Sequence, residues 1–113
     1  MPLTVHRLDA DVCVSPQLGP EAMAEVAAAG FRSVINNRPD FEGGPSQPTN
    51  ESVASAARAA GLDYAFLPVA PNFQSEDDIA RFRDLIASLP NPVLVFCRSG
   101  ARSSKLWAAA TGR

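Results

Sequence analysis

The residues best suited to chemistry in this sequence lie together in one short segment, CRSGARS, at residues 97–103. Cys97 follows an apolar run, and the segment leads into residues with helical spacing. A loop between a buried strand and a helix turns successive main-chain N–H groups toward one point, which attracts anions and favours thiolate over thiol. A cysteine with a free pKa of about 8.5 then ionises closer to neutral pH. We therefore predict that Cys97 is a nucleophile in a bowl of main-chain amides that is open to solvent.

The rest of the segment is predicted to bind an anion beside this thiol. Gly100 lets the main chain bend where a Cβ would obstruct it, and Arg102 offers a planar fork of donors to a tetrahedral oxyanion. Arg98 adds a second positive charge at the mouth. The loop is completed by Ser99, Ala101 and Ser103. The alternative is a buried structural cysteine at an ordinary strand-to-helix junction. Two arginines around a Ser-Gly pair beside a thiol favour catalysis.

The spacing between Cys97 and Arg102 bears on the type of reaction. Protein tyrosine phosphatases carry the arginine six positions after the cysteine, a position that Ser103 occupies here. Arg102 lies five positions after Cys97, so CRSGARS resembles the active loop of many rhodaneses. A tighter loop makes a smaller bowl, which suits the terminal sulfur of a persulfide or thiosulfate better than a phosphate.

Helical and strand patterns alternate along the chain, which is typical of an α/β domain. Apolar spacing, capping residues and terminal glycines or prolines predict helices at residues 20–29, 50–60, 76–89 and 103–110. Apolar and β-branched runs predict strands at residues 5–8, 12–14, 33–36, 64–69 and 93–96. We expect a three-layer sandwich with a mostly parallel central sheet and helices on both faces. The 93–96 strand would deliver Cys97 to the C-terminal edge of the sheet.

The segment at residues 38–48 is rich in Pro, Gly and Ser and has no periodicity, so we predict a loop. A functional loop and a disordered surface excursion both stay open. Arg38 follows a predicted strand at the edge where α/β proteins bind ligands, which makes it a candidate for the rim of the site. A solvated ion pair with Asp40 or Glu42 is the alternative.

Three further side chains are assigned no catalytic role. His6 is expected on the surface or in strand packing, and Trp107 is expected to anchor the core. Cys13 is interpreted as a small packing residue, with a resolving thiol for a Cys97 persulfide as the alternative.

Several segments resemble the phosphatase-like domain of beta-lactamase-hydrolase-like bacterial proteins. They are VSPQL at 14–18, NNRPDFE at 36–42, AAGL at 59–62, LPV at 67–69 and CRSGARS at 97–103. The resemblance implies a dual-specificity-phosphatase-like fold of the protein-tyrosine-phosphatase type with a loop of rhodanese length; a rhodanese-like fold is the alternative. It also implies a sulfur transferase or phosphatase in sulfide detoxification, with Cys97 as nucleophile and Arg102 as the anion-binding arginine.

One departure from that pattern concerns the proton donor. Phosphatases of this fold carry a general-acid Asp on the loop after the strand that corresponds to residues 67–69, and here that loop reads APNFQ. The nearest carboxylates, Asp77 and Asp78, are predicted to cap the helix that follows. Losing a general acid lowers the rate of phosphate ester hydrolysis by roughly 10²- to 10⁴-fold. Sulfur transfer has no such need, because thiolate and sulfite leave unprotonated near pH 7.

Composition excludes several classes of function. The 113 residues, 46% apolar and 19% charged, predict one compact domain over residues 1–113. A net charge of −2 without a basic stripe argues against nucleic acid. No apolar stretch is long enough to span a membrane, and no signal-peptide pattern opens the sequence, so we expect a cytoplasmic protein. A single histidine and two distant cysteines predict no metal, and no cofactor is expected.

We therefore predict a sulfurtransferase. The Cys97 thiolate takes sulfane sulfur from thiosulfate, glutathione persulfide or polysulfide and passes it to a thiol, sulfite or cyanide. The expected partners are these small sulfur compounds and a persulfide dioxygenase or another sulfide-oxidising enzyme. Two alternatives stay open: a phosphatase that forms a phosphocysteine at Cys97, and a non-catalytic persulfide carrier or sensor.

Overall fold

Strands and helices alternate along residues 3–112, the part of the chain that the computed structural model describes. The strands are β1 (His6–Arg7), β2 (Val12–Ser15), β3 (Ser33–Asn36), β4 (Asp63–Phe66) and β5 (Val93–Phe96). The helices are a 3₁₀ turn, η1 (Pro20–Ala22), followed by α1 (Met23–Ala28), α2 (Asn50–Ala59), α3 (Glu76–Ser88) and α4 (Ala101–Thr111). Every helix and strand predicted above therefore has a counterpart in the structure.

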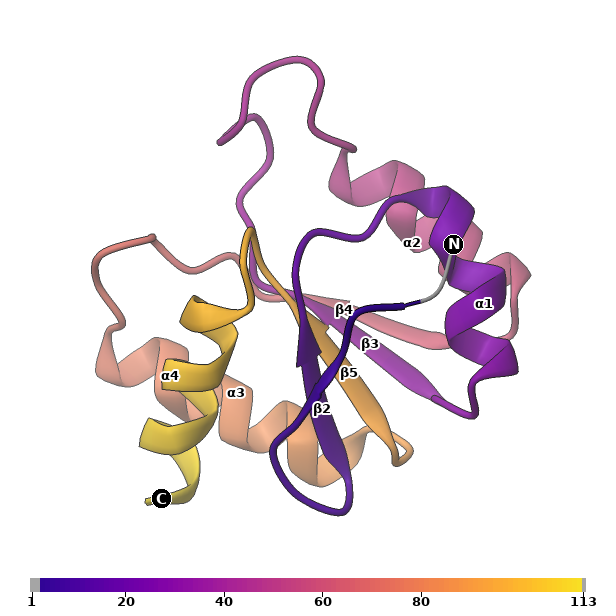
Figure 1. The fold of residues 1–113 in the computed structure, drawn as a ribbon. Coiled ribbons are helices and arrows are strands. Elements are labelled where there is room, and N and C mark those ends of the chain that lie inside the picture. Colours follow the sequence, from indigo (N-terminus) through magenta and orange to yellow (C-terminus); the bar gives the residue numbers. More distant parts are fainter. Residues whose placement is uncertain (1–2, 113) are drawn as a thin grey trace.

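The strands form one twisted sheet in the order β1-β2-β5-β3-β4 (Figure 1). β1 is antiparallel to β2, and the other neighbours are parallel, which confirms the prediction of a mostly parallel sheet. β5 lies in the middle, with Val95 opposite Val14 of β2 on one side and Ile35 of β3 on the other. All four residues of β5 are buried, as expected for a strand covered on both faces.

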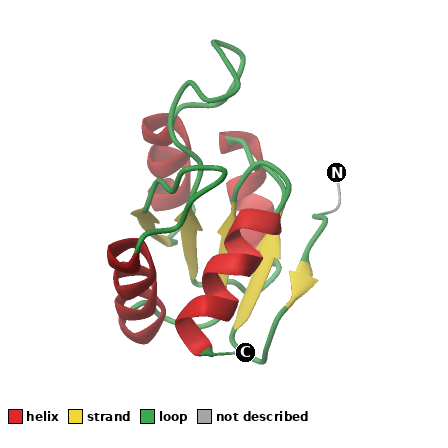
Figure 2. Cartoon of the chain, turned by 90° about the vertical axis from the view of Figure 1, so that its left-hand side faces the viewer, coloured by secondary structure: helices red, strands yellow, loops and turns green. Residues whose placement is uncertain are grey.

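Helices cover both faces of this sheet and make a three-layer sandwich (Figures 1 and 2). Side chains alternate across β5, so Val93 and Val95 pack in the same cluster as Phe82 of α3 and Leu106 of α4. On the other face, Leu94 and Phe96 of β5 pack in a cluster with Met23 and Val26 of α1 and Val53 and Ala57 of α2. Burying each of the larger side chains contributes about 1.5–3 kcal/mol relative to exposing it. The strand that carries Cys97 is thus fixed from both sides.

Most predicted bounds lie within one residue of the observed ones, and two were wrong by more than that, each for a local reason. The strand predicted at 64–69 ends at Phe66, because Pro68 has no N–H to continue the ladder. Leu67 and Val69 still donate main-chain hydrogen bonds to the carbonyls of Asn36 and Asn37. The last helix begins at Ala101 rather than Ser103, which places Arg102 and Ser103 in its first turn instead of in a loop.

The parallel strands β2, β3 and β5 direct their C-terminal ends to one edge of the sheet. The segments that follow them are residues 16–19, 37–49 and 97–100, and all three meet at this edge (Figure 1). Within residues 3–112, no helix is both long enough and apolar enough to cross a bilayer. The edge where the three segments meet holds the residues that could do chemistry.

Candidate active site

Cys97 lies directly after β5, as predicted, but its side chain is not open to solvent. Only 1% of the residue is exposed. The prediction of a solvent-open thiol is corrected here: β2 and β3 flank the strand end, and the loop folds back over the sulfur. The main-chain N–H of Gly100 donates to Sγ of Cys97 at 3.1 Å. The sulfur is therefore buried in the bowl of amides rather than among hydrocarbon groups alone.

The surroundings of Cys97 favour its thiolate. Burial raises the pKa of the thiol, but hydrogen bonds from the main chain and hydroxyl of Ser103 and from the main chain of Ser99 and Gly100 outweigh it. The result is a pKa below the ordinary value of the thiol. Ser103 is completely buried, so its hydroxyl acts in a medium where hydrogen bonds are strong. The surroundings thus favour ionisation of this thiol relative to a free cysteine.

Gly100 sets the direction of the loop at the point where α4 begins. Its φ of +93° places it in the left-handed region, which a residue with a Cβ rarely adopts. An added Cβ would lie 3.5 Å from the main chain of Ser15, which is ordinary van der Waals contact. Glycine is needed here for the backbone angle, as the predicted bend requires, but the prediction that a Cβ would obstruct the loop was wrong. The turn brings Arg102 and Ser103 onto the first turn of the helix.

Arg102 reaches over the loop with a nearly buried side chain, 9% exposed. Its Nη1 donates to the carbonyl of Val69 at 3.0 Å, and its Nη2 donates to Oε1 of Glu42 at 3.0 Å. Nε is buried and has no hydrogen-bond partner among the described residues. A buried, unpaired N–H on a cation is costly, and an oxyanion bound beside it would satisfy it. This donor is the strongest structural sign that the site binds an anion.

Glu42 links Arg102 to Arg38. Its Oε1 also accepts a hydrogen bond from Nε of Arg38 at 2.9 Å. Desolvation raises the pKa of the Glu42 carboxyl, but hydrogen bonds from Arg102 and Arg38 outweigh it and hold the pKa below its usual range. Glu42 is therefore a carboxylate at neutral pH. The sequence offered it only as a surface partner for Arg38, so its contact with Arg102, 60 residues away, was missed.

Arg38 lies at the rim of the site and also forms an ion pair with Glu42, although these roles were predicted as alternatives. The ion pair was expected in solvent, and that expectation was wrong, since Arg38 is only 9% exposed. Its Nη1 also donates to Oε1 of Gln17, which follows β2. A signal for Gln17 was available, because it lies three residues after the strand predicted at 12–14, in a sheet predicted to be mostly parallel, and so close to the edge where ligands bind.

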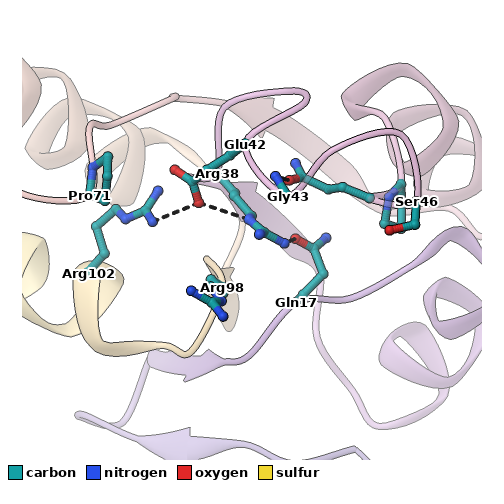
Figure 3. Close-up of a pocket in the computed structure, with 10 residues that line it drawn as sticks. Gln17, Arg38, Glu42, Gly43, Ser46, Pro71, Arg98 and Arg102 are labelled. Atoms are coloured by element: carbon teal, nitrogen blue, oxygen red, sulfur yellow. Dashed lines mark hydrogen bonds and ion pairs between the residues drawn. The ribbon is translucent and has the colours of Figure 1, made fainter.

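A polar pocket of about 720 Å³ opens beside this cluster (Figure 3). It is lined by Gln17, Arg38, Glu42, Gly43, Ser46, Gln47, Pro48, Pro71, Arg98 and Arg102. Three arginines face one carboxylate, so the pocket carries an excess of positive charge. Arg98 is exposed at its mouth, where it was predicted. Of the other predicted loop residues, Ser99 and Ala101 are exposed and lie outside the set that lines the pocket.

The segment at residues 38–48 is an ordered loop that forms one wall of the pocket. Gln47 is buried and fastens it, because its Oε1 accepts from the N–H of Gly43 and its Nε2 donates to the carbonyl of Pro39. Oδ1 of Asp40 accepts from the N–H of Asn50, at the start of α2. The functional alternative for this loop is the one that the structure favours.

The other residues considered in the sequence lie outside the pocket and have local structural roles. Asp78 forms a capping box with Ser75, as predicted, whereas Asp77 lies in the first turn of α3 and pairs with Arg81. Cys13 pairs with Leu94 across the sheet, three residues before Cys97. At about 3.3 Å per residue the two cysteines are roughly 10 Å apart, which exceeds disulfide range. His6 is exposed in β1, and Trp107 is buried in the core.

Comparisons with known proteins agree with this geometry. A model of the phosphatase-like domain of beta-lactamase hydrolase-like proteins matches residues 4–112. The beta-lactamase hydrolase-like protein of Xylella fastidiosa (strain Temecula1) is 42% identical over 97 residues, which cover 86% of this chain and 22% of that protein. The chain thus spans about a fifth of the length of this relative.

Solved structures extend the comparison. A phosphatase candidate from Neisseria meningitidis is 35% identical with a TM-score of 0.83, over 90% of this chain and 72% of that one. Kinase associated phosphatase shares the fold at 13% identity, with a TM-score of 0.81 over 97% of this chain and 73% of its own. The predicted phosphatase-like fold is confirmed.

Proposed function

Because the chain belongs to the phosphatase-like domain family of beta-lactamase hydrolase-like proteins, we propose that it is a cysteine-dependent enzyme that transfers sulfane sulfur through Cys97. The family's phosphatase-like fold supports the general chemistry, a cysteine thiolate that attacks an atom of a bound anion. The choice of sulfur transfer rests on the proton donors of the pocket.

The observation that carries this choice is the state of Glu42. Among the described residues that line the pocket, it is the only carboxylic acid, and its pKa is held low by Arg102 and Arg38. It therefore has no proton to give to a leaving group near pH 7. Phosphate ester hydrolysis with an alkoxide leaving group gains about 10²- to 10⁴-fold from a general acid. Sulfite and thiolates leave as anions and gain nothing from one.

In the proposed first step, Sγ of the Cys97 thiolate attacks the sulfane sulfur of thiosulfate. A Cys97 S–S bond forms, the S–S bond of thiosulfate breaks, and sulfite leaves with the electron pair. In the second step, an acceptor thiolate attacks the outer sulfur of the Cys97 persulfide. The acceptor becomes a persulfide, and Cys97 leaves as a thiolate. Nε of Arg102 and the loop amides hold the anionic oxygens of the donor.

Sulfur transfer can be tested by mass spectrometry of the intact protein and of its peptides. Incubation with thiosulfate or glutathione persulfide should add one sulfur atom to the peptide that contains Cys97, and a thiol acceptor should remove it. Cys97→Ser should lose the adduct and turnover, whereas the matched control Cys13→Ser should keep both. Equal transfer rates in wild type and Cys97→Ser would refute the mechanism. An adduct that forms once without turnover would identify a persulfide carrier or sensor instead.

A second candidate function is phosphatase activity through a Cys97 phosphocysteine. The phosphatase folds among the structural neighbours of this chain favour that function. The aryloxide of an aryl phosphate leaves with little acid assistance, so the low pKa of Glu42 does not prevent hydrolysis of such an ester. We expect slow release of an aryl alcohol and far slower hydrolysis of phosphoserine. Robust turnover of phosphoserine without sulfur transfer would make phosphate the substrate.

A further inference from the structure

Four hydrogen bonds, which we call the Tyr64 network, connect both sides of the base of the loop that follows β3. The main-chain N–H of Arg38 donates to Oδ1 of Asn36 at 2.8 Å, and Nδ2 of Asn36 donates to the hydroxyl of Tyr64 at 3.1 Å. That hydroxyl donates to Oδ1 of Asn50 at 2.7 Å. The main-chain N–H of Asn50 donates to Oδ1 of Asp40 at 2.7 Å. Because Arg38 and Asp40 are two residues apart in the chain, the network begins and ends at the base of this loop.

The direction of each side-chain hydrogen bond in the Tyr64 network is fixed by its partners. The main-chain N–H of Arg38 can only donate, so Oδ1 of Asn36 faces it and Nδ2 faces Tyr64. An amide NH₂ group also only donates, so the single proton of the Tyr64 hydroxyl is left for Asn50. Burial raises the pKa of Tyr64 to about 12, so the hydroxyl keeps this proton near neutral pH. Tyr64 of β4 therefore links the end of β3 to the start of α2.

The loop held by the Tyr64 network contains a strained residue, Phe41. Its φ of +63° lies in the left-handed region, which a bulky residue rarely adopts. The side chain of Phe41 is 70% exposed, so its own burial does little to offset the strain. Such a conformation persists where surrounding contacts impose it. The turn lies between Asp40, which Asn50 holds, and Glu42, so the contact at Asp40 helps to aim Glu42 into the pocket.

We propose that Tyr64 is a positioning residue of the anion site, because its hydroxyl holds the base of the loop from which Arg38 and Glu42 reach into the pocket. Both side chains meet there, and Glu42 also accepts from Arg102 (Figure 3). Tyr64 itself lies outside the set of residues that lines the pocket. Without its hydroxyl, the base of the loop is free to move, and a bound oxyanion has to order the arginines itself. That ordering lowers affinity.

The proposal rests on the anion pocket of the proposed function and not on the choice between sulfur and phosphate. It can therefore be tested with inorganic sulfate, a tetrahedral oxyanion that does not react with a thiol. The experiment uses the intact chain in a Cys13→Ser background at constant ionic strength. The rate at which iodoacetamide modifies Cys97 is measured as sulfate is added. The sulfate concentration that gives half-protection reports binding, and the rate without sulfate reports the reactivity of the thiol.

Tyr64→Phe keeps the aromatic ring and removes only the hydroxyl. It should raise the sulfate concentration for half-protection about three- to tenfold, the value of about one net hydrogen bond. Asn50→Ala removes the acceptor of the same hydroxyl and should cause a similar rise. In the Tyr64→Phe background, Asn50→Ala should add little, because both substitutions break one connected network. Neither substitution changes a charge.

The matched control is Ser33→Ala, at the opposite end of β3 from the site. Ser33 is buried, and its hydroxyl donates to the carbonyl of Pro90 at 2.7 Å. The control therefore also removes a buried hydrogen bond without changing a charge. It should lower the stability of the protein, measured by thermal unfolding, and leave half-protection by sulfate unchanged.

Four outcomes would overturn the proposal. Equal half-protection in the parent protein and Tyr64→Phe would show that the hydroxyl does not position the site. An equal rise in Ser33→Ala would assign the effect to a general loss of stability. Fully additive effects of Tyr64→Phe and Asn50→Ala would mean that they act by separate routes. No protection by sulfate in the parent protein would show that the pocket does not bind such oxyanions. Because sulfate is not turned over, each outcome is distinct from a failure to detect sulfur transfer.

Discussion

Glu42 is the residue on which the two inner arginines of the site converge. One oxygen, Oε1, accepts from both Arg38 and Arg102, and the side chain is 19% exposed. Without this carboxylate, two guanidinium groups would face each other in a poorly solvated pocket. Removing one partner of a buried pair leaves the other charge uncompensated, which costs more than an exposed ion pair contributes.

The pH dependence of stability should report this arrangement. Because the folded-state pKa of Glu42 lies below its unfolded value, its stabilisation is full above the unfolded pKa and is lost as pH falls through the folded pKa. Glu42→Gln should lower the free energy of unfolding by about 1–3 kcal/mol at pH 7. That difference from wild type should shrink as the carboxylate is protonated. Urea unfolding at a series of pH values measures it.

A matched control for Glu42 is Glu51→Gln, which removes the same charge from an exposed position in the first turn of α2. It should change stability by only a few tenths of a kcal/mol, the value of a helix-dipole interaction. If the two variants lost equal stability at pH 7, Glu42 would be an ordinary surface residue.

At the residue scale, the sequence predicted the candidate nucleophile and its neighbouring arginine but not the residues that contact that arginine. Cys97, Gly100 and Arg102 could be predicted because local spacing alone defines an anion-binding loop. Glu42 and Gln17 could not be paired with arginines, since those contacts span 60 and 21 residues and no periodicity encodes them. The burial of Cys97 depends on the neighbouring strands β2 and β3, so it could not be predicted from the local sequence either.

At the scale of elements, the turn from β5 into α4 rests on Gly100. Its left-handed φ aims its own N–H at the sulfur of Cys97 and begins the helix that carries Arg102. Gly112 ends the same helix in the same left-handed region, with a φ of +74°. An added Cβ meets nothing within 4 Å there. A substitution at either glycine strains the backbone, but only a substitution at Gly100 also affects the contact with Cys97.

Gly100→Ala and Gly112→Ala should each destabilise the protein by about 1–2 kcal/mol, the cost of a left-handed non-glycine residue. Only Gly100→Ala should also slow alkylation of Cys97 by iodoacetamide, because it misaligns a donor to the thiolate. Thermal unfolding and the rate of Cys97 modification measure the two effects separately. Equal alkylation rates in both variants would mean that the Gly100 N–H does not activate the thiol.

The elements themselves were largely predictable because their signals are local. The strands at 33–36 and 93–96 were predicted at their observed bounds, since both are fully buried runs that end at polar residues or cysteine. The start of α4 was placed two residues late, because a glycine in a loop motif does not reveal that it is also the helix N-cap. The order of strands needed the structure.

At the scale of the whole molecule, the charge of the site opposes the charge of the chain. The net charge is −2, yet the pocket combines Arg38, Arg98 and Arg102 with the single carboxylate of Glu42. A concave surface of one sign concentrates ions of the other sign and accelerates their arrival, and salt screens this effect over about 10 Å at 0.1 M. The protein should therefore attract small anions to one place on its surface while repelling them weakly elsewhere.

Paired alkylating reagents of different charge can measure this attraction. Relative to neutral iodoacetamide, anionic iodoacetate should react several-fold faster with Cys97 than with Cys13, and the preference should fall as ionic strength rises. Arg98→Gln should reduce it, because Arg98 is the exposed cation at the mouth. Arg58→Gln removes the same charge from the last turn of α2, outside the pocket lining, and should leave the preference nearly intact. Equal losses in the two variants would assign the attraction to net charge rather than to the arrangement of arginines around the loop.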